Sequence, residues 1–404
     1  MNCKLIVTLE NDIIYSALLD EKDQLIEIHP EKTDRDSLVG NIYIGKVSNI
    51  VKGIRATFVN IGLEKDVFLQ VEDGQHFIYT NGMASHNLPK VGDELLVQIT
   101  KDAYKTKAAS ATGLINLTGR YCVLTYKKNF VGLSSKITHF QERARLKTIF
   151  TPLLCEDFGF IVRTNAQKVS EEELIKESEL LINTFKKLVE VSNFRPCFQC
   201  LYKEPENYIR LIRDLYTSNV WTTLFDDEIL YQKAVDYFND KYEAGITANF
   251  ELRTDLNYTL YKAFSLQNKV EKALHEKVWL SSGANLFIQA TEALFVIDVN
   301  TSKSSSKKNF EETVYQINLE AAMEIARQIR LRNLSGIIIV DFIDMQVEEH
   351  KQQLLETLQS YFHMDRIKTT VVDMTPLGLV EITRKKTDKN IYEKFKGLEV
   401  GRDE

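Results

Sequence analysis

Two short, continuous apolar runs in the last third of the chain each lead into an aspartate. Residues 293–300 and residues 336–344 lack polar alternation, a pattern typical of strands that are buried on both faces of a sheet. The segment between them, residues 311–332, has the spacing of a helix. Its apolar side is formed by Val314, Ile317, Ala321, Ile325 and Ile329. A strand, a helix and a strand make a crossover unit, so the two strands are predicted to run parallel.

The aspartates in these runs, Asp298 and Asp341, are expected at one edge of the sheet, where parallel strands end and α/β folds bind ligands. On neighbouring strands they would lie about 4.8 Å apart, and two carboxylates at that separation repel each other unless a cation lies between them. Asn300 adds a neutral oxygen, and such oxygen ligands suit Mg²⁺ or Mn²⁺. A single aspartate in this position is often only a turn former, and Asp344 could assist the site or cap a helix. The pair, however, predicts a metal site able to activate water at a phosphodiester.

The first third of the chain alternates as strands do. Residues 1–30 predict a strand meander, and residues 39–119 predict five short strands with Gly turns, which suggests a small barrel of the OB type. Phe58 and Phe68 fall on these strands, where aromatic side chains either fill a core or stack on bases. The positive charge for such a nucleic-acid groove would come from Lys101 and Lys107. The pattern alone leaves both interpretations open.

The middle of the chain is mixed. It predicts strands at residues 159–164 and 197–202, a helix at 171–191 and a helix-rich stretch at 210–242. The pair Cys197 and Cys200 could form half of a zinc site or a redox pair. No second C-x-x-C accompanies it, and both residues fall in a predicted strand, which favours a structural role.

The composition narrows the class of protein. A chain of 404 residues with 44% hydrophobic and 27% charged residues is typical of a soluble globular protein with two to four domains. No apolar run approaches the ~18 residues of a membrane span, and five cysteines, an odd number, argue against a disulfide framework. With no signal-peptide pattern at the N-terminus, a cytoplasmic location is expected.

The net charge of −6 speaks weakly against non-specific nucleic-acid binding, but basic clusters occur. They are Lys101, Lys105 and Lys107; Arg143, Arg145 and Lys147; Lys303, Lys307 and Lys308; and Arg384, Lys385 and Lys386. Each is either a solvated face or a binding surface, and the last two flank the paired strands, which favours binding there.

Longer motifs carry a family resemblance. Residues 291–301 (Thr-Glu-Ala-Leu-Phe-Val-Ile-Asp-Val-Asn-Thr), the segment 318–336 that begins Asn-Leu-Glu-Ala-Ala, and residues 339–345 (Ile-Val-Asp-Phe-Ile-Asp-Met) resemble the catalytic core of bacterial ribonuclease E/G. Residues 378–384 match the segment that closes that core. The resemblance covers almost the whole chain and is weak only from about 215 to 275.

The resemblance implies an α+β multidomain fold. Its parts would be an RNase H-like piece in two segments, an inserted OB-type RNA-binding barrel, a 5′-end sensor and a DNase I-like α/β nuclease domain. In this chain they are expected at residues 1–38 with 209–278, 39–120, 121–208 and 279–404 respectively.

The resemblance also implies an activity and residues for it. The activity is a hydrolase: a Mg²⁺-dependent endoribonuclease of RNA processing and decay that cleaves single-stranded RNA and leaves 5′-phosphate and 3′-hydroxyl ends. Asp298 and Asp341 match the metal-binding aspartates of the family and Asn300 its accompanying asparagine. Among the remaining residues, Phe58, Phe68, Lys101 and Lys107 match RNA contacts, and Arg163, Thr164 and Lys368 match the 5′-monophosphate pocket.

Two departures from the family pattern modify these expectations. No cysteine lies beyond Cys200, so a zinc link between subunits is not expected, and the chain would be a monomer or a homodimer without that link. Lys368 stands where the family has an arginine, and lysine keeps the charge but loses bidentate geometry, which predicts weaker selectivity for 5′-monophosphate ends. Two rival interpretations are a non-catalytic RNA-binding scaffold, which should have lost one of the paired aspartates, and a nuclease that needs a partner chain.

Overall fold

The computed structural model describes residues 3–33, 37–72, 75–80, 88–103, 107–215, 222–242, 246–254, 258–301, 310–363 and 365–399. Lys105 and the basic run Lys303, Lys307 and Lys308 lie outside these residues. The chain divides into two compact units: residues 1–34, 219–233 and 248–404 form unit 1, and residues 35–218 and 234–247 form unit 2. The finer limits of the predicted domains stay a prediction.

Unit 1 contains a five-stranded sheet built around the N-terminal meander. Its strand order is β15-β14-β1-β2-β3. The strands are β1 (Lys4–Glu10), β2 (Ile13–Leu19), β3 (Leu25–Lys32), β14 (Thr222–Phe225) and β15 (Phe250–Leu252). The antiparallel meander matches the predicted one. Strands β14 and β15 extend the sheet in parallel, and β14 falls in the stretch that was predicted to be helix-rich. Helices α5 (Leu260–Ala263), α6 (Leu266–Leu274) and α9 (Ile391–Glu399) pack into the apolar core of this sheet.

The second sheet of unit 1 contains the two apolar runs. Its order is β16-β17-β18-β19-β21-β20. The strands are β16 (Lys277–Trp279), β17 (Asn285–Ala290), β18 (Phe295–Asn300), β19 (Gly336–Asp341), β20 (Thr369–Met374) and β21 (Leu379–Arg384). Strands β18 and β19 are parallel neighbours joined through α7 (Phe310–Leu331), so the crossover unit is confirmed. We call this sheet the catalytic sheet, after the role that the resemblance predicts for Asp298 and Asp341.

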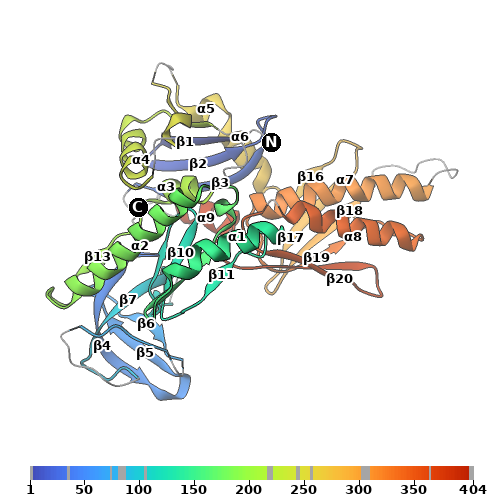
Figure 1. Ribbon diagram of the computed structural model, residues 1–404. Helices are drawn as coiled ribbons and strands as arrows, with labels where there is room; N and C mark the ends of the chain where they lie inside the picture. The colour runs from blue at the N-terminus through green and yellow to red at the C-terminus, as the bar shows by residue number, and fades with distance from the viewer. Residues whose placement is uncertain are drawn as a thin grey trace. The chain divides into compact units, whose positions relative to one another are not determined.

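Helices α7 and α8 (Glu348–Phe362) lie side by side along one face of the catalytic sheet (Figure 1). The apolar core forms between them and every second side chain of the strands. The expectation that β18 and β19 are buried on both faces is therefore wrong, since Ile337 is 50% exposed. The strands are apolar on both sides, but both helices cover the same side.

Unit 2 contains a closed five-stranded barrel. Strands β4 (Ile42–Val51), β5 (Ala56–Asn60), β6 (Val67–Gln70), β8 (Ser110–Thr112) and β7 (Glu94–Lys101) follow one another around it. The pairing of β4 with β7 closes the ring, as the predicted OB-type barrel requires. Strand β13 (Cys200–Tyr202) adds to the outer edge of β4. It is shorter than predicted because Phe198 takes a left-handed backbone conformation, with φ at 72°, that a strand does not allow.

The rest of unit 2 is a second sheet with helices. The sheet order is β11-β12-β10-β9, and its strands are β9 (Asn116–Thr118), β10 (Cys122–Tyr126), β11 (Val131–Leu133) and β12 (Phe158–Val162). Helices α1 (Phe140–Phe150) and α2 (Glu171–Ser192) pack on it, and α3 (Asn207–Asp214) follows β13. Ser170 caps α2 by accepting a hydrogen bond from the N–H of Glu173, which fixes the start of the predicted amphipathic helix. Helix α4 (Glu228–Lys241) contains the point where the two units divide. Within the described ranges, no helix is long and apolar enough to cross a membrane.

Candidate functional site

The two predicted carboxylates lie opposite each other on neighbouring strands. Asp298 of β18 and Asp341 of β19 are register partners in the parallel ladder, and Asp341 is exposed while Asp298 is half-buried. Asn300 Nδ2 donates a hydrogen bond of 2.6 Å to Asp298 Oδ2, which fixes the orientation of that carboxylate. The sheet thus brings together all three residues that the sequence pattern selected.

The charges at this edge favour a cation. Partial burial and the negative charges of Asp298 and Asp344 raise the pKa of the Asp341 carboxyl. Like charges this close are relieved by a proton or by a cation. In the described part of the chain no cluster of three or more His, Cys, Asp or Glu side chains is arranged to hold a metal ion. A donor set of two carboxylates and one amide still suits Mg²⁺, which keeps several waters and is often held by only one or two protein carboxylates.

Helix α7 holds the segment that follows Asp341. Asn318 is completely buried, its Nδ2 donates to the Ile343 carbonyl at 2.8 Å, and its Oδ1 accepts from the Ile343 N–H at 3.1 Å. In the first turn of the helix, Glu311 accepts hydrogen bonds of 3.0 Å from the backbone N–H groups of Gln346 and Val347. These backbone bonds lower the pKa of Glu311. Two side chains of α7 therefore anchor the chain on the C-terminal side of Asp341.

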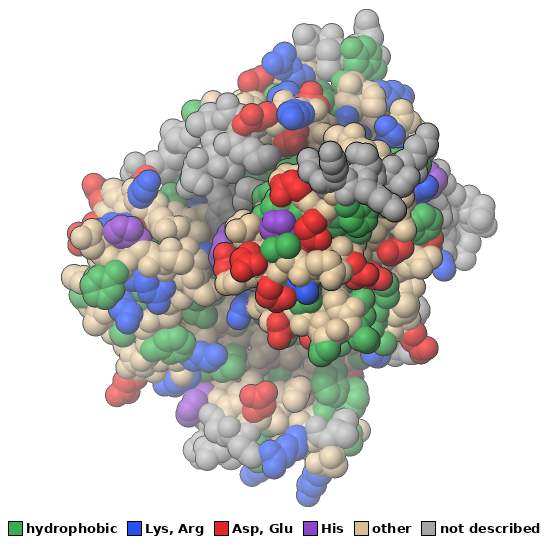
Figure 2. Space-filling view, turned by 90° about the vertical axis from the view of Figure 1, so that its right-hand side faces the viewer, with side chains coloured by type: hydrophobic (Ala, Val, Ile, Leu, Met, Phe, Trp, Pro, Cys, Tyr) green, Lys and Arg blue, Asp and Glu red, His purple; other side chains and the backbone are tan. Residues whose placement is uncertain are grey.

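The outer ends of these helices are acidic. Glu311 and Glu312 lie in the first turn of α7, and Glu348 and Glu349 in the first turn of α8, where carboxylates are favoured by the helix dipole. Figure 2 shows Asp and Glu side chains gathered around these ends. A polyanion approaching the catalytic sheet from the helix side would meet this negative charge.

The barrel presents aromatic and basic side chains in one row. Phe58 and Phe68 are directly opposed on β5 and β6, with ring centroids 6.0 Å apart in an edge-to-face arrangement. Ser110 is the register partner of Phe68 on one side and of Lys101 on the other. Both rings are half-buried while Lys101 and Lys107 are exposed. The rings belong to the outside of the barrel, because the neighbouring residues on their strands point into its core.

A model of the ribonuclease E/G family matches residues 116–387. The chain belongs to the ribonuclease E/G family. It is 35% identical to ribonuclease G of Haemophilus influenzae over 382 residues, which is 92% of this chain and 77% of that protein. It is 36% identical to ribonuclease G of Escherichia coli over 376 residues, or 91% of this chain and 76% of that protein. Ribonuclease E of Synechocystis is 34% identical over 380 residues, or 93% of this chain and 56% of that protein.

The predicted sensor residues of this ribonuclease E/G family member fall within the matched range. Arg163 follows β12, and its Nη1 donates to the Gly119 carbonyl at 2.7 Å and to Asp214 Oδ1 at 2.8 Å. The Thr164 hydroxyl is 3.0 Å from that of Ser134. The guanidinium thus already has a carboxylate partner inside unit 2, with which a phosphate group would compete. Their role in sensing a 5′-monophosphate stays a prediction.

Two further predicted features keep an open role. Lys368 is exposed and precedes β20 in unit 1, whereas Arg163 and Thr164 belong to unit 2. Cys197 and Cys200 are free thiols whose pKa values are raised mainly by burial, and a raised pKa disfavours the thiolate needed for metal binding or redox chemistry.

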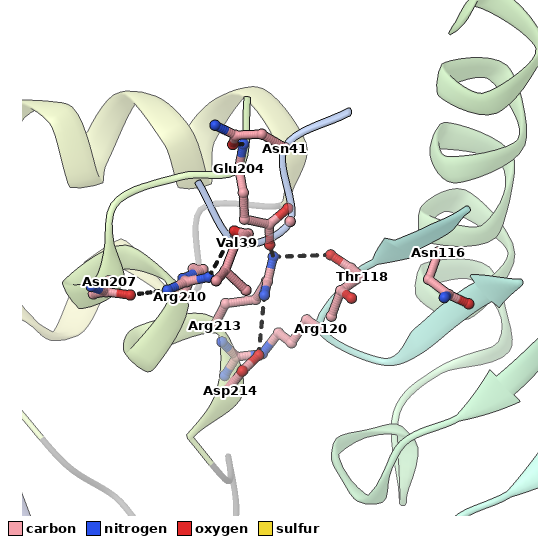
Figure 3. Close-up of polar contacts among 12 residues, drawn as sticks. Val39, Asn41, Asn116, Thr118, Arg120, Glu204, Asn207, Arg210, Arg213 and Asp214 are labelled. Carbon is pink, nitrogen blue, oxygen red and sulfur yellow. Dashed lines mark hydrogen bonds and ion pairs between the residues drawn. The ribbon is translucent and has the colours of Figure 1, made fainter. Parts of the chain in front are cut away.

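Unit 2 contains a buried network of ion pairs that the sequence pattern did not predict. Arg213 is 3% exposed, and its Nη1 donates to Glu204 Oε1 at 2.7 Å and to the Thr118 carbonyl at 3.0 Å (Figure 3). Its Nε donates to Asp214 Oδ1 at 3.1 Å, the same oxygen that Arg163 contacts. Burial disfavours the charged guanidinium, but the two carboxylates raise its pKa well above the usual value. The only sequence signal was an arginine on the apolar side of α3.

Proposed function

We propose that this chain is a Mg²⁺-dependent endoribonuclease that cleaves single-stranded RNA and leaves 5′-phosphate and 3′-hydroxyl ends, with Mn²⁺ as a possible substitute. It would act in RNA processing and decay, including the processing of ribosomal RNA and the decay of messenger RNA, in the cytoplasm. The observation that carries the proposal is the register pairing of Asp298 with Asp341 beside Asn300. The names of the relatives, ribonuclease G and ribonuclease E, support the same activity.

Each residue at the centre has a definite part in this proposal. Asp298 and Asp341 would hold the metal, which when bound supplies an activated water and neutralises charge on the reacting phosphodiester. Asn300 orients the Asp298 carboxylate through its hydrogen bond of 2.6 Å. Asn318 and Glu311 fix the backbone beyond Asp341, so that its carboxylate keeps its place when RNA binds.

The RNA itself would be held by the barrel. Phe58 and Phe68 offer aromatic surface on which unstacked bases can stack, and Lys101 and Lys107 offer positive charge for the phosphates. Such a surface accepts single-stranded rather than double-stranded RNA, because only unpaired bases can leave their stack to contact the rings. The oligomeric state proposed is a monomer or a homodimer without a zinc link.

The experiment that tests the proposal is cleavage of a short single-stranded RNA, labelled at its 3′ end, with Mg²⁺ or with EDTA. Asp298→Asn and Asp341→Asn should each abolish cleavage while RNA binding stays close to the wild-type level. Asp373→Asn, an exposed aspartate on the same sheet, is the matched control and should cleave normally. Full activity in either of the first two variants would refute the metal assignment. RNA binding without cleavage by the wild-type chain would instead favour the scaffold or a partner-dependent enzyme.

A further inference from the structure

Among the described residues of unit 1, no helix covers the second face of the catalytic sheet. Side chains that point toward α7 and α8 form the core, and they include Leu286, Ile288, Ile297, Val299, Ile338 and Val340. The alternate side chains, among them Trp279 and Ile337, point to the other face, and these two are 63% and 50% exposed. Asp298 and Asp341 belong to this second face, because the neighbours Ile297 and Val340 belong to the core.

A single row of residues crosses this open face toward the two aspartates. Lys277 of β16 is opposite Phe287 of β17, and Phe287 is in turn opposite Asp298 of β18. Asp298 is opposite Asp341. Directly opposed residues on adjacent strands project from the same face, so a cation, an aromatic ring and the two carboxylates are aligned across four strands. With a strand spacing of about 4.8 Å, the aromatic ring stands one strand away from Asp298.

Trp279 completes the aromatic part of this row. It lies two residues beyond Lys277 on the same strand and therefore on the same face. Lys277 Nζ is 4.0 Å from the centroid of the Trp279 ring and 6.0 Å from that of Phe287. Trp279 does not serve as a core residue, because its side chain is mostly exposed to water. Aromatic rings beside an ammonium group are the combination that binds the bases and phosphates of single-stranded nucleic acid.

We propose that Trp279, Phe287 and Lys277 form an RNA-stacking platform on the catalytic sheet, which holds a nucleotide next to the phosphodiester that is cut. The platform is separate in the sequence from the aromatic row of the barrel. It rests on the proposed function, because its position has meaning for cleavage only if Asp298 and Asp341 form the reaction centre. It adds to that function a second contact with the substrate, made by the nuclease sheet itself.

The ammonium group among the rings favours RNA as the occupant of the platform, whereas the part of this face beyond the platform carries the carboxylates of Asp298, Asp341 and Glu381. The opposite side of the sheet carries helices with acidic first turns, whereas the platform places an ammonium group among the rings. The row leads without interruption to the carboxylates that would hold the metal, so a chain of phosphates bound at Lys277 continues toward them. Because every base has a π face, the platform tolerates any sequence but requires unpaired bases.

The direct test uses the fluorescence of Trp279. The sequence contains two tryptophans, Trp221 and Trp279, so Trp221→Phe makes Trp279 the sole reporter. In a Trp221→Phe, Asp341→Asn chain, which should not cut RNA, titration with a single-stranded oligonucleotide should quench the fluorescence and saturate together with binding. A duplex of the same sequence should quench far less. An unchanged signal while the single strand binds would overturn the proposal, as would a signal that only a protein partner alters.

Substitutions give a second readout. Trp279→Ala should weaken single-strand binding about tenfold and raise KM more than it lowers kcat, in line with the loss of one stacked base. Trp279→Phe should recover most of the affinity, and Lys277→Ala should make binding less sensitive to salt. Phe68→Ala, which removes one ring of the barrel, should weaken single-strand binding by a similar factor. Phe140→Ala, which removes an aromatic side chain of α1 that is 82% exposed, is the neutral control.

The two proposals fail in different ways. If the platform is wrong, Mg²⁺-dependent cleavage persists and still needs Asp298 and Asp341, but Trp279→Ala binds and cuts RNA like the wild type. If the nuclease assignment is wrong, the wild-type chain does not cut, whereas quenching of Trp279 by single-stranded RNA still reports the platform.

Discussion

Replacing Asn318 by leucine tests whether α7 positions the reaction centre. The side chain is completely buried and exchanges two hydrogen bonds with Ile343, of 2.8 and 3.1 Å. Leucine has a similar size, so the change removes these bonds and creates little cavity. Two lost hydrogen bonds cost about 2 kcal/mol, and the cost rises to about 4 kcal/mol if the N–H and C=O of Ile343 stay buried without partners.

The expected result is measurable in stability and in activity. A loss of about 2–4 kcal/mol should lower the melting temperature of the transition that involves unit 1 by roughly 5–15 °C. Calorimetry of the full chain measures this shift. Because the segment beyond Asp341 loses its anchor, kcat should fall at least about tenfold, since small misplacements of reacting groups are costly. KM should change little, because the proposed RNA-contacting residues lie on other elements.

The control for Asn318→Leu is Gln316→Leu, an exposed position of the same helix, which should shift stability by less than about 0.5 kcal/mol. A large loss of stability with unchanged kcat would show that Asn318 supports the fold but does not position the centre. Unchanged stability would refute the account of the two hydrogen bonds altogether.

Two further predictions concern the buried carboxylate of Glu27 and the half-buried ion pair of Arg163 with Asp214. Burial alone would raise the pKa of Glu27, but two arginine side chains hold it well below the usual range, so its stabilising contribution is complete above about pH 4.3 and is lost as the pH falls further. Thermal unfolding at pH 3–7 should therefore show a steeper acid loss for the wild type than for Glu27→Gln, and parallel curves would contradict this. Asp214→Asn should release Arg163 and raise the ratio of cleavage rates on 5′-monophosphate and 5′-hydroxyl RNA a few-fold, measured with paired substrates. A fall in that ratio in a variant of normal melting temperature would count against Arg163 as a phosphate ligand.

The fold was predictable where the pattern is local and long. The runs around Asp298 and Asp341, joined by one helix, specified a parallel pair, and the structure places the two residues in register. The parallel strands β14 and β15 were not predictable, because they have only four and three residues and complete a sheet begun by the N-terminus. Such short strands form because they pair with neighbouring strands, and their own sequence contains too few residues to show a strand pattern.

The candidate site was predictable where its residues lie at the ends of apolar runs. Asp298 and Asp341 can be recognised in the sequence because each follows an apolar run. Asn318, by contrast, is one polar residue in a helix, and its role is visible only from its hydrogen bond to Ile343. The platform was missed for a similar reason: Trp279 and Phe287 belong to different strands, and only the ladder shows that they share a face with the carboxylates. Which residues of different strands lie opposite each other depends on the strand register, and the register is difficult to predict from the sequence.

The interleaving of the two units has a consequence for the order of events during synthesis. Thr8 and Asp226 hydrogen bond at 2.6 Å although 218 positions separate them. At the rate of ribosomal synthesis, roughly 10–40 s pass between the synthesis of β1 and that of its parallel partner β14. During this interval one edge of the N-terminal meander is unpaired. Residues 35–218, most of unit 2, emerge during that interval and can fold first. An unpaired strand edge invites pairing with other chains. The nascent protein is therefore most exposed to misassembly before its two-part sheet is closed.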